Sequence, residues 1–171
     1  MQNPLQFEPH LTLTSDVPQD ITDGTTDSQA WLDGLHIPIS AKPLTRFESL
    51  DIGDQFFKKL MLSASKVPLL ELVIQTRAAA VEDGNQSAAS SWANKDWAPH
   101  VSLLYADVEI VEQKREEVLQ ALHKAGIRLD EERGVAAVES GDFDGWDGGR
   151  IVLVPTWRDP KEWVVVAERE V

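Results

Sequence analysis

Hydrophobic and polar residues alternate in two short stretches of the chain, and these stretches have almost the same sequence. Residues 9–13 read Pro-His-Leu-Thr-Leu, and residues 99–103 read Pro-His-Val-Ser-Leu. The alternation has the period of a half-buried β-strand, in which every second side chain points to the same face. We therefore predict strands over residues 7–15 and 98–106, each with one imidazole and one hydroxyl on a common side.

The side chains on these faces are His10 and Thr12 in the first string and His100 and Ser102 in the second. The chain has only four histidines, so two of them in a repeated string are an unusual coincidence. Motif matches are hypotheses, so an alternative has to be weighed. In this alternative, the two strand histidines form hydrogen bonds within the core and have no catalytic role. We favour the interpretation that one functional site is built from two similar strands.

Periodicity and turn residues divide the rest of the chain into further elements. Helices are predicted over residues 28–34, 67–81 and 108–125. Strands are predicted over residues 41–50, 56–65, 127–129, 134–138, 151–155 and 162–168. The polar stretch 82–96 is predicted as a mobile loop, and residues 145–149 as a glycine-rich turn. Strands outnumber helices, and helices follow strands only intermittently, which favours an α+β fold over a doubly wound sheet.

The composition narrows the class of ligand. The chain has 171 residues and a formal net charge of −13, from 16 basic and 29 acidic residues. RNA and other polyanions bind through many Lys and Arg contacts to phosphate, so no extended nucleic acid is expected as a partner. A small nucleotide substrate fits this composition, because a local cluster of donors can oppose the field of the whole protein.

The absence of cysteine excludes further classes of chemistry. Disulfides, zinc–thiolate sites and thiol nucleophiles all need cysteine. No apolar run approaches the roughly 18 residues of a membrane helix, and the amino terminus lacks the basic start and apolar stretch of a secretory signal. We therefore expect one cytoplasmic domain over residues 1–171, a monomer that contacts no membrane.

Two imidazoles and two hydroxyls suit the hydrolysis of a phosphoester. A neutral imidazole accepts a proton and an imidazolium donates one near pH 7, so a pair can serve as base and acid. Thr12 and Ser102 follow the histidines by about 7 Å along each strand, which suits hydroxyls that hold phosphate oxygens. We expect no metal and no cofactor. Two alternatives stay open: a metallohydrolase that adds Asp16 or Asp107 to the histidines, and a non-catalytic nucleotide-binding module.

The longer context of both strings resembles the two-histidine (2H) phosphoesterase superfamily, and within it the cyclic phosphodiesterases of fungi and plants. The resemblance is carried by residues 7–15 (FEPHLTLTS) and 99–105 (PHVSLLY). Residues 51–59 (DIGDQFFKK), 145–149 (GWDGG) and 153–156 (LVPT) are similar to the fungal branch. The resemblance thus extends over nearly the whole chain.

The resemblance implies a bilobal fold: two pseudo-symmetric antiparallel sheets with helices outside and an active site in the central cleft. It implies hydrolysis of nucleoside 2′,3′-cyclic phosphates to 2′-phosphates, and of ADP-ribose 1″,2″-cyclic phosphate, a by-product of tRNA splicing. Carried over by position, His10 and His100 are the proton-transfer pair, and Thr12 and Ser102 bind the phosphate. We expect His100 to activate water, assisted by Tyr105, and His10 to protonate the leaving oxygen.

Several expectations follow from departures and gaps in the resemblance. Family members usually have an additional strand and helix before the first string, whereas nine residues precede His10 here. Either the sequence is truncated or this variant dispenses with those elements, and we expect them to be absent. The Golgi is the alternative compartment that the family suggests.

Trp92 and Trp97 are expected to anchor the core or a loop, with stacking on a base as the alternative. The cation that steadies the phosphate has four candidates: Lys42, Arg77, Lys95 and Arg150.

Overall fold

The computed structural model describes residues 8–38, 42–53, 58–105, 109–126, 128–130, 136–139 and 144–171. The chain divides into two compact units, each assembled from three separate stretches. Unit 1 comprises residues 1–12, 45–66 and 98–146, and unit 2 comprises residues 13–44, 67–97 and 147–171. Both repeated strings begin in unit 1.

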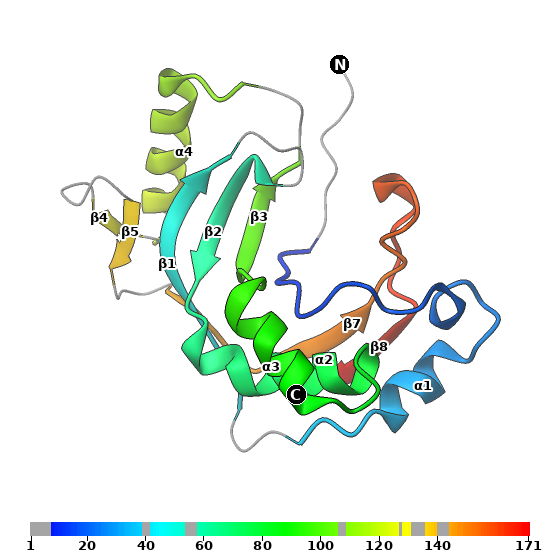
Figure 1. Ribbon diagram of the computed structural model, residues 1–171. Coiled ribbons are helices and arrows are strands. Elements are labelled where there is room, and N and C mark those ends of the chain that lie inside the picture. Colours follow the sequence, from blue (N-terminus) through cyan, green and yellow to red (C-terminus); the bar gives the residue numbers. More distant parts are fainter. Residues whose placement is uncertain are drawn as a thin grey trace. The chain divides into compact units, whose positions relative to one another are not determined.

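Unit 1 is built around an antiparallel sheet with the strand order β3-β2-β1-β5-β4, and β6 pairs with β1 (Figure 1). Its strands are β1 (Leu44–Ile52), β2 (Leu60–Ala64), β3 (His100–Leu104), β4 (Arg128–Asp130), β5 (Ala136–Glu139) and β6 (Gly145–Asp147). β1 and β2 form an antiparallel pair at the predicted strands 41–50 and 56–65, and β3 lies within the predicted strand 98–106. β4 and β5 confirm the two predicted strand pieces, whose residues Ile127 and Gly134 lie outside the described residues.

One face of this sheet carries the core of unit 1. The buried members of the core are Phe47, Leu50, Leu60, Leu62, Ala64 and Val101. Helix α4 (Glu112–Lys124) packs against them through Val118, Leu119 and Leu122. The apolar face of the sheet is therefore covered by α4 (Figure 1), and the opposite face holds the alternate, more polar positions of β1, β2 and β3.

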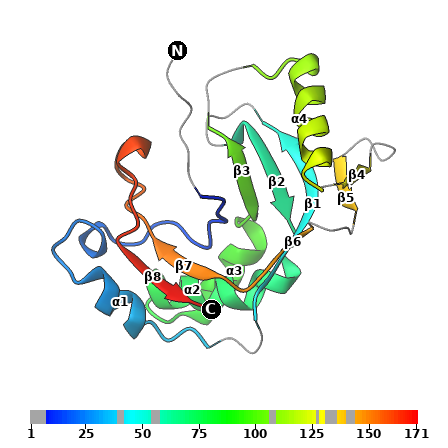
Figure 2. The ribbon, with the colours of Figure 1, turned by 180° about the vertical axis from the view of Figure 1, so that it is seen from behind.

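Unit 2 combines three helices with a two-stranded antiparallel sheet (Figure 2). Its elements are α1 (Ser28–Gly34), α2 (Leu70–Ala80), α3 (Gln86–Lys95), β7 (Arg150–Leu153) and β8 (Ala167–Glu170), with short 3₁₀ turns at Gln19–Ile21, Val67–Leu69 and Pro160–Glu162. Its core contains Ile21, Leu32, Ile37, Leu72, Ile151, Leu153 and Ala167. Across the described ranges, every helix is too short or too polar to span a bilayer.

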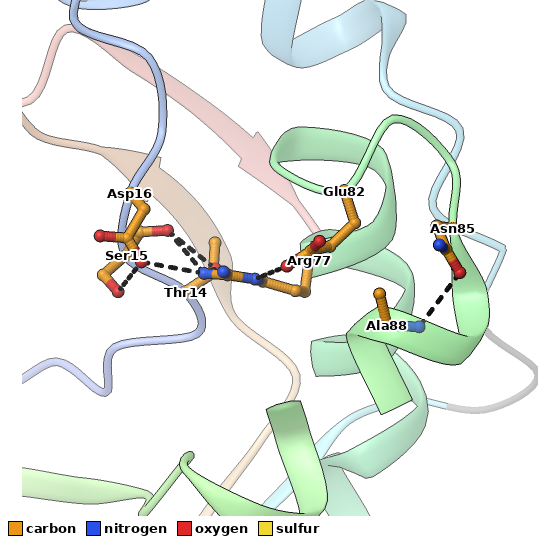
Figure 3. Close-up of polar contacts among 7 residues, drawn as sticks. All are labelled: Thr14, Ser15, Asp16, Arg77, Glu82, Asn85 and Ala88. Carbon is orange, nitrogen blue, oxygen red and sulfur yellow. Dashed lines mark hydrogen bonds and ion pairs between the residues drawn. The ribbon is translucent and has the colours of Figure 1, made fainter. Parts of the chain in front are cut away.

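The predicted loop over residues 82–96 is wrong, because most of this stretch forms α3. The side chain of Asn85 caps the helix by accepting a hydrogen bond from the Ala88 amide, at 3.1 Å (Figure 3). Ala89 and Ala93, four residues apart, are completely buried. Small side chains at this spacing let α3 pack closely against α2. The small and polar residues from which we predicted a loop are therefore residues of a closely packed helix.

The predicted first strand over residues 7–15 is also wrong in extent. Residue 7 lies outside the described residues, and Leu11 makes only one isolated antiparallel bridge, to Val101. The last strand begins at Ala167, later than predicted, and a 3₁₀ turn, Pro160–Glu162, includes the first residue of the predicted range. The first helix has the predicted bounds.

The predicted glycine-rich turn contains a strand, β6. Gly145 has φ +148°, and a Cβ atom there would lie 1.8 Å from the carbonyl oxygen of Thr45. Only glycine permits this approach, so the glycine lets β6 pair closely with β1. The α+β class is confirmed. The pseudo-symmetry of two lobes stays a prediction.

Candidate active site

The two repeated strings lie next to each other in unit 1, joined by the antiparallel bridge between Leu11 and Val101. Val101 is 2% exposed, and Leu11 packs against the same core. Because successive side chains of an extended chain point to opposite faces, the residues that flank this bridge point away from the core. These residues are His10 and Thr12 in the first string and His100 and Ser102 in the second.

The bridge also fixes which of these side chains are neighbours. In an antiparallel pair centred on Leu11 and Val101, His10 faces Ser102 and Thr12 faces His100. The two histidines are then diagonal neighbours, whose Cβ atoms are separated by roughly 7 Å. This separation leaves room for one phosphate group between two imidazoles, with a hydroxyl beside each ring.

Each imidazole is oriented by the main chain of its own string. Nδ1 of His10 lies 2.8 Å from the carbonyl oxygen of Glu8, and Nδ1 of His100 lies 2.8 Å from that of Ala98. A carbonyl oxygen only accepts hydrogen bonds, so Nδ1 carries the proton in both rings. Nε2 is consequently the nitrogen that can gain or lose a proton in each.

The repeated proline explains why both strings make this contact. It stands between the accepting carbonyl and the histidine in each copy, at Pro9 and Pro99. Proline has a fixed φ and restricts the residue before it to extended backbone. The position of each carbonyl relative to the ring two residues later is therefore limited by the local sequence.

Tyr105 lies at the first histidine, whereas we predicted that it would assist His100. Its hydroxyl oxygen is 3.3 Å from Nε2 of His10, and it also forms a hydrogen bond with Ser102. The reason is the antiparallel bridge, which brings Ser102, and with it the end of β3, to His10. Burial raises the pKa of the Tyr105 hydroxyl above its ordinary value, and the hydrogen bond with Ser102 opposes this shift. Tyr105 therefore stays protonated at neutral pH, so its hydroxyl keeps a proton that it can donate in a hydrogen bond.

A group of polar residues that we did not predict continues from the histidines across β2 and β1. Ser63 on β2 pairs with His100 on β3, and Ser49 on β1 pairs with Ser63. Asp51 on β1 accepts hydrogen bonds from both serines at the same oxygen, Oδ2, with Ser49 Oγ at 2.9 Å. All three are half-buried. The alternation of polar and apolar residues in β1 and β2 is the sequence signal that could have revealed these residues. Which of them are neighbours across the strands depends on the fold.

The four candidate phosphate-binding cations, Lys42, Arg77, Lys95 and Arg150, all belong to unit 2. Arg150 forms an ion pair with Glu168 at 2.8 Å. A role for one of these cations in phosphate binding stays a prediction.

Arg77 is a buried charge, 8% exposed, that holds the chain after the first string (Figure 3). Its Nη1 donates to the hydroxyl oxygen of Thr14, the carbonyl oxygen of Ser15 and the carboxylate of Asp16, at 3.0–3.2 Å. Its Nε donates to Glu82 at 2.9 Å. Hydrogen bonds from Ser15 and then from Arg77 lower the pKa of Asp16 below its ordinary value.

The tryptophans near the second string have packing contacts, as predicted. The ring centroid of Trp92 lies 4.4 Å from the guanidinium carbon of Arg77, and Trp97 is 5% exposed. A cation over an aromatic face is favourable. Trp92 thus stabilises the Arg77 guanidinium.

The carboxylates proposed for the metallohydrolase alternative have different outcomes. Asp16 is bound to Arg77, and Asp107 lies outside the described residues. Among the residues that the structure describes, no three His, Cys, Asp or Glu side chains are grouped so that they could hold a metal ion.

Comparisons with known proteins agree with the resemblance found in the sequence. The model of the cyclic phosphodiesterase-like protein family matches residues 2–171. A 2′,3′-cyclic-nucleotide 3′-phosphodiesterase of Phaeosphaeria nodorum is 35% identical over 166 residues, which cover 96% of this chain and 81% of that protein. An enzyme of the same name from Neurospora crassa is 31% identical over 170 residues, covering 95% of this chain and 77% of that protein. No solved structure matches. The chain belongs to the family of cyclic phosphodiesterase-like proteins.

Proposed function

We propose that this protein hydrolyses nucleoside 2′,3′-cyclic phosphates at the 3′ bond and releases nucleoside 2′-phosphates. The observation that carries the proposal is the pair of diagonal imidazoles, each with Nδ1 held by the carbonyl two residues before it. The names of the fungal relatives, 2′,3′-cyclic-nucleotide 3′-phosphodiesterase, support the substrate class.

In the proposed reaction, Nε2 of neutral His100 accepts a proton from water as the water oxygen attacks phosphorus. The bond between phosphorus and O3′ breaks, and Nε2 of protonated His10 donates its proton to O3′. One water is consumed, the phosphate stays on O2′, and the two rings exchange protonation states. Catalysis of phosphoryl transfer depends mainly on positioning and charge stabilisation, which these fixed side chains can supply.

The hydroxyl groups beside the rings are proposed to bind the phosphate. Thr12 faces His100 and Ser102 faces His10, so one hydroxyl stands beside each proton-transfer group. Each hydroxyl can donate one hydrogen bond to a nonbridging oxygen. Tyr105, which contacts His10 and Ser102, is proposed as a third donor to the phosphate.

The same reaction centre is proposed to open ADP-ribose 1″,2″-cyclic phosphate to ADP-ribose 1″-phosphate, since the reacting group is again a five-membered cyclic phosphodiester. Two imidazoles supply both proton transfers, so we propose that the reaction needs no metal. We further propose that the protein is located in the cytoplasm and that its fold is bilobal and pseudo-symmetric.

The test is product analysis with 2′,3′-cyclic AMP in the presence of a chelator such as EDTA. We expect 2′-AMP as the product and an unchanged rate with the chelator, because a catalytic metal would be removed together with the activity. Formation of 3′-AMP would contradict the proposed regiochemistry. Loss of turnover on chelation, restored by a divalent metal, would favour the metallohydrolase. Calorimetric binding without product would identify a non-catalytic nucleotide-binding module.

A further inference from the structure

The polar side chains of β1 and β2 offer hydrogen-bond acceptors on the face that carries the histidines. We call Ser49, Asp51 and Ser63 the acceptor strip. Each serine has one O–H group, and both O–H groups are donated to Oδ2 of Asp51. The strip can then present acceptors to a ligand, namely the lone pairs of the serine oxygens and Oδ1 of Asp51.

The strand register places this strip beside the candidate active site. The row Thr12, His100, Ser63 and Ser49 runs straight across four neighbouring chain segments, from the first string to β1. Adjacent strands are separated by about 4.8 Å, so β1 lies roughly 10 Å from β3. The Asp51 side chain turns back toward β2, where it meets Ser63. A ligand held at the histidines by its phosphate can reach the strip with a nucleoside.

The polarity of the strip determines which part of a cyclic nucleotide it fits. Phosphate oxygens are acceptors and carry negative charge, so a carboxylate with two outward serine lone pairs repels them. The N–H groups of a nucleobase are donors and complement it. A carboxylate accepts well from the exocyclic amine of cytosine or adenine, whereas uracil presents a carbonyl oxygen at the corresponding position of its ring.

We propose that Ser49, Asp51 and Ser63 form the base-binding subsite of this protein, and that Asp51 selects bases with an exocyclic amine. This inference rests on the proposed function, because it assumes that a cyclic nucleotide binds with its phosphate between His10 and His100. It adds a substrate preference: 2′,3′-cyclic CMP is used better than 2′,3′-cyclic UMP. One well-placed hydrogen bond with a base edge corresponds to a preference of about tenfold.

The decisive variant is Asp51→Asn. The two serine hydroxyls donate to Oδ2 in the native protein, so the amide oxygen of asparagine takes that place and the amide nitrogen occupies the position of Oδ1. The strip then presents a donor in place of an acceptor. We expect the ratio of kcat/KM for cyclic CMP to that for cyclic UMP to fall from about ten to below one.

The matched control is Glu48→Gln. Glu48 is the exposed residue next to Ser49 on β1, and the substitution removes the same charge from the same strand without changing the strip. It should leave the CMP-to-UMP ratio at its native value. Because both substrates are measured with the same protein sample, the ratio does not depend on the fraction of the variant that is correctly folded.

Three results distinguish the possible failures. Turnover of both nucleotides by the native protein at equal kcat/KM would overturn the proposed preference. A native preference that Asp51→Asn leaves unchanged would overturn the role of Asp51, while the proposed function would stand. Absence of product from both nucleotides with the native protein would overturn the proposed function and this inference with it.

Discussion

The second copy of the repeated string lies in β3, a strand that pairs with β2 over four residue pairs, whereas the first copy makes a single isolated bridge at Leu11. Both copies nevertheless place their histidine on the same face and hold Nδ1 with the same main-chain contact. One bridge and one partly buried side chain are enough to set the direction of the neighbouring side chains. A complete strand is not needed for this purpose.

The two copies differ in what holds them in place. β3 shares a register of four residue pairs with β2, while the first copy continues into Thr14, Ser15 and Asp16, which Arg77 binds. Segments with few main-chain hydrogen bonds open more easily than regular strands. The comparison therefore predicts that side-chain contacts hold the first copy in place, whereas main-chain hydrogen bonds with β2 hold the second.

The largest expected effect comes from removing the histidines. His10→Ala and His100→Ala should each lower kcat on 2′,3′-cyclic AMP by at least about 100-fold, since each removes one proton-transfer group. If the two act as one unit, the double variant should be little slower than either single variant. Steady-state kinetics with samples matched for folding by circular dichroism measures this. Near-native turnover by either variant would rule out the paired mechanism.

Arg77→Met tests how the chain after the first copy is held. The guanidinium is buried and binds Asp16 and Glu82, which are 68% and 25% exposed. Both carboxylates can regain water in part, so the free energy of unfolding should fall by about 2–3 kcal/mol, less than for a fully buried pair. Amide exchange should rise in residues 14–16 more than in β3.

The control for this variant is Arg150→Met, which removes an exposed ion pair with Glu168. Exposed pairs contribute little, so the loss should stay below about 1 kcal/mol in urea unfolding. Equal losses for the two arginine variants would show that burial of Arg77 has no special importance.

Truncation of the two bridged apolar residues compares the copies directly. Val101 is 2% exposed, whereas Leu11 is only partly buried. Val101→Ala should therefore cost about 2 kcal/mol and Leu11→Ala about 1 kcal/mol, although leucine loses the larger side chain. Urea unfolding followed by tryptophan fluorescence measures both. A larger cost at Leu11 would mean that the first copy is packed as firmly as the second.

The smallest effect concerns Asp16 and pH. Its pKa in the folded protein lies below its ordinary value because Ser15 and Arg77 donate to the carboxylate. Its contribution to stability is thus present above the pKa of the unfolded chain and is lost as the pH falls through the lower pKa of the folded state. Asp16→Asn should cost less than about 1 kcal/mol at pH 7, and the difference should disappear in acid. Unfolding curves of the native protein and Asp16→Asn at pH 7 and in acid measure this difference. A difference in the free energy of unfolding that grows in acid would contradict the prediction.

Local sequence predicted the directions of the histidines and hydroxyls, because alternation sets them within a few residues. It did not predict α3, since alanine and serine occur both in loops and in closely packed helices, and only burial of Ala89 and Ala93 distinguishes the two. The contact of Tyr105 with His10 and the pairing of Ser63 with His100 could not be predicted either. Both depend on strand register, which joins residues far apart in the chain.

The carbonyl oxygens of Glu8 and Ala98 have an evolutionary consequence. Many hydrolases orient a histidine with a carboxylate from a distant part of the chain, as in a Ser-His-Asp triad. Here the orienting group lies two residues before the ring, so copying one short peptide transfers the imidazole together with its tautomer. Gene duplication could thus supply the second half of the pair without inventing a new partner for it.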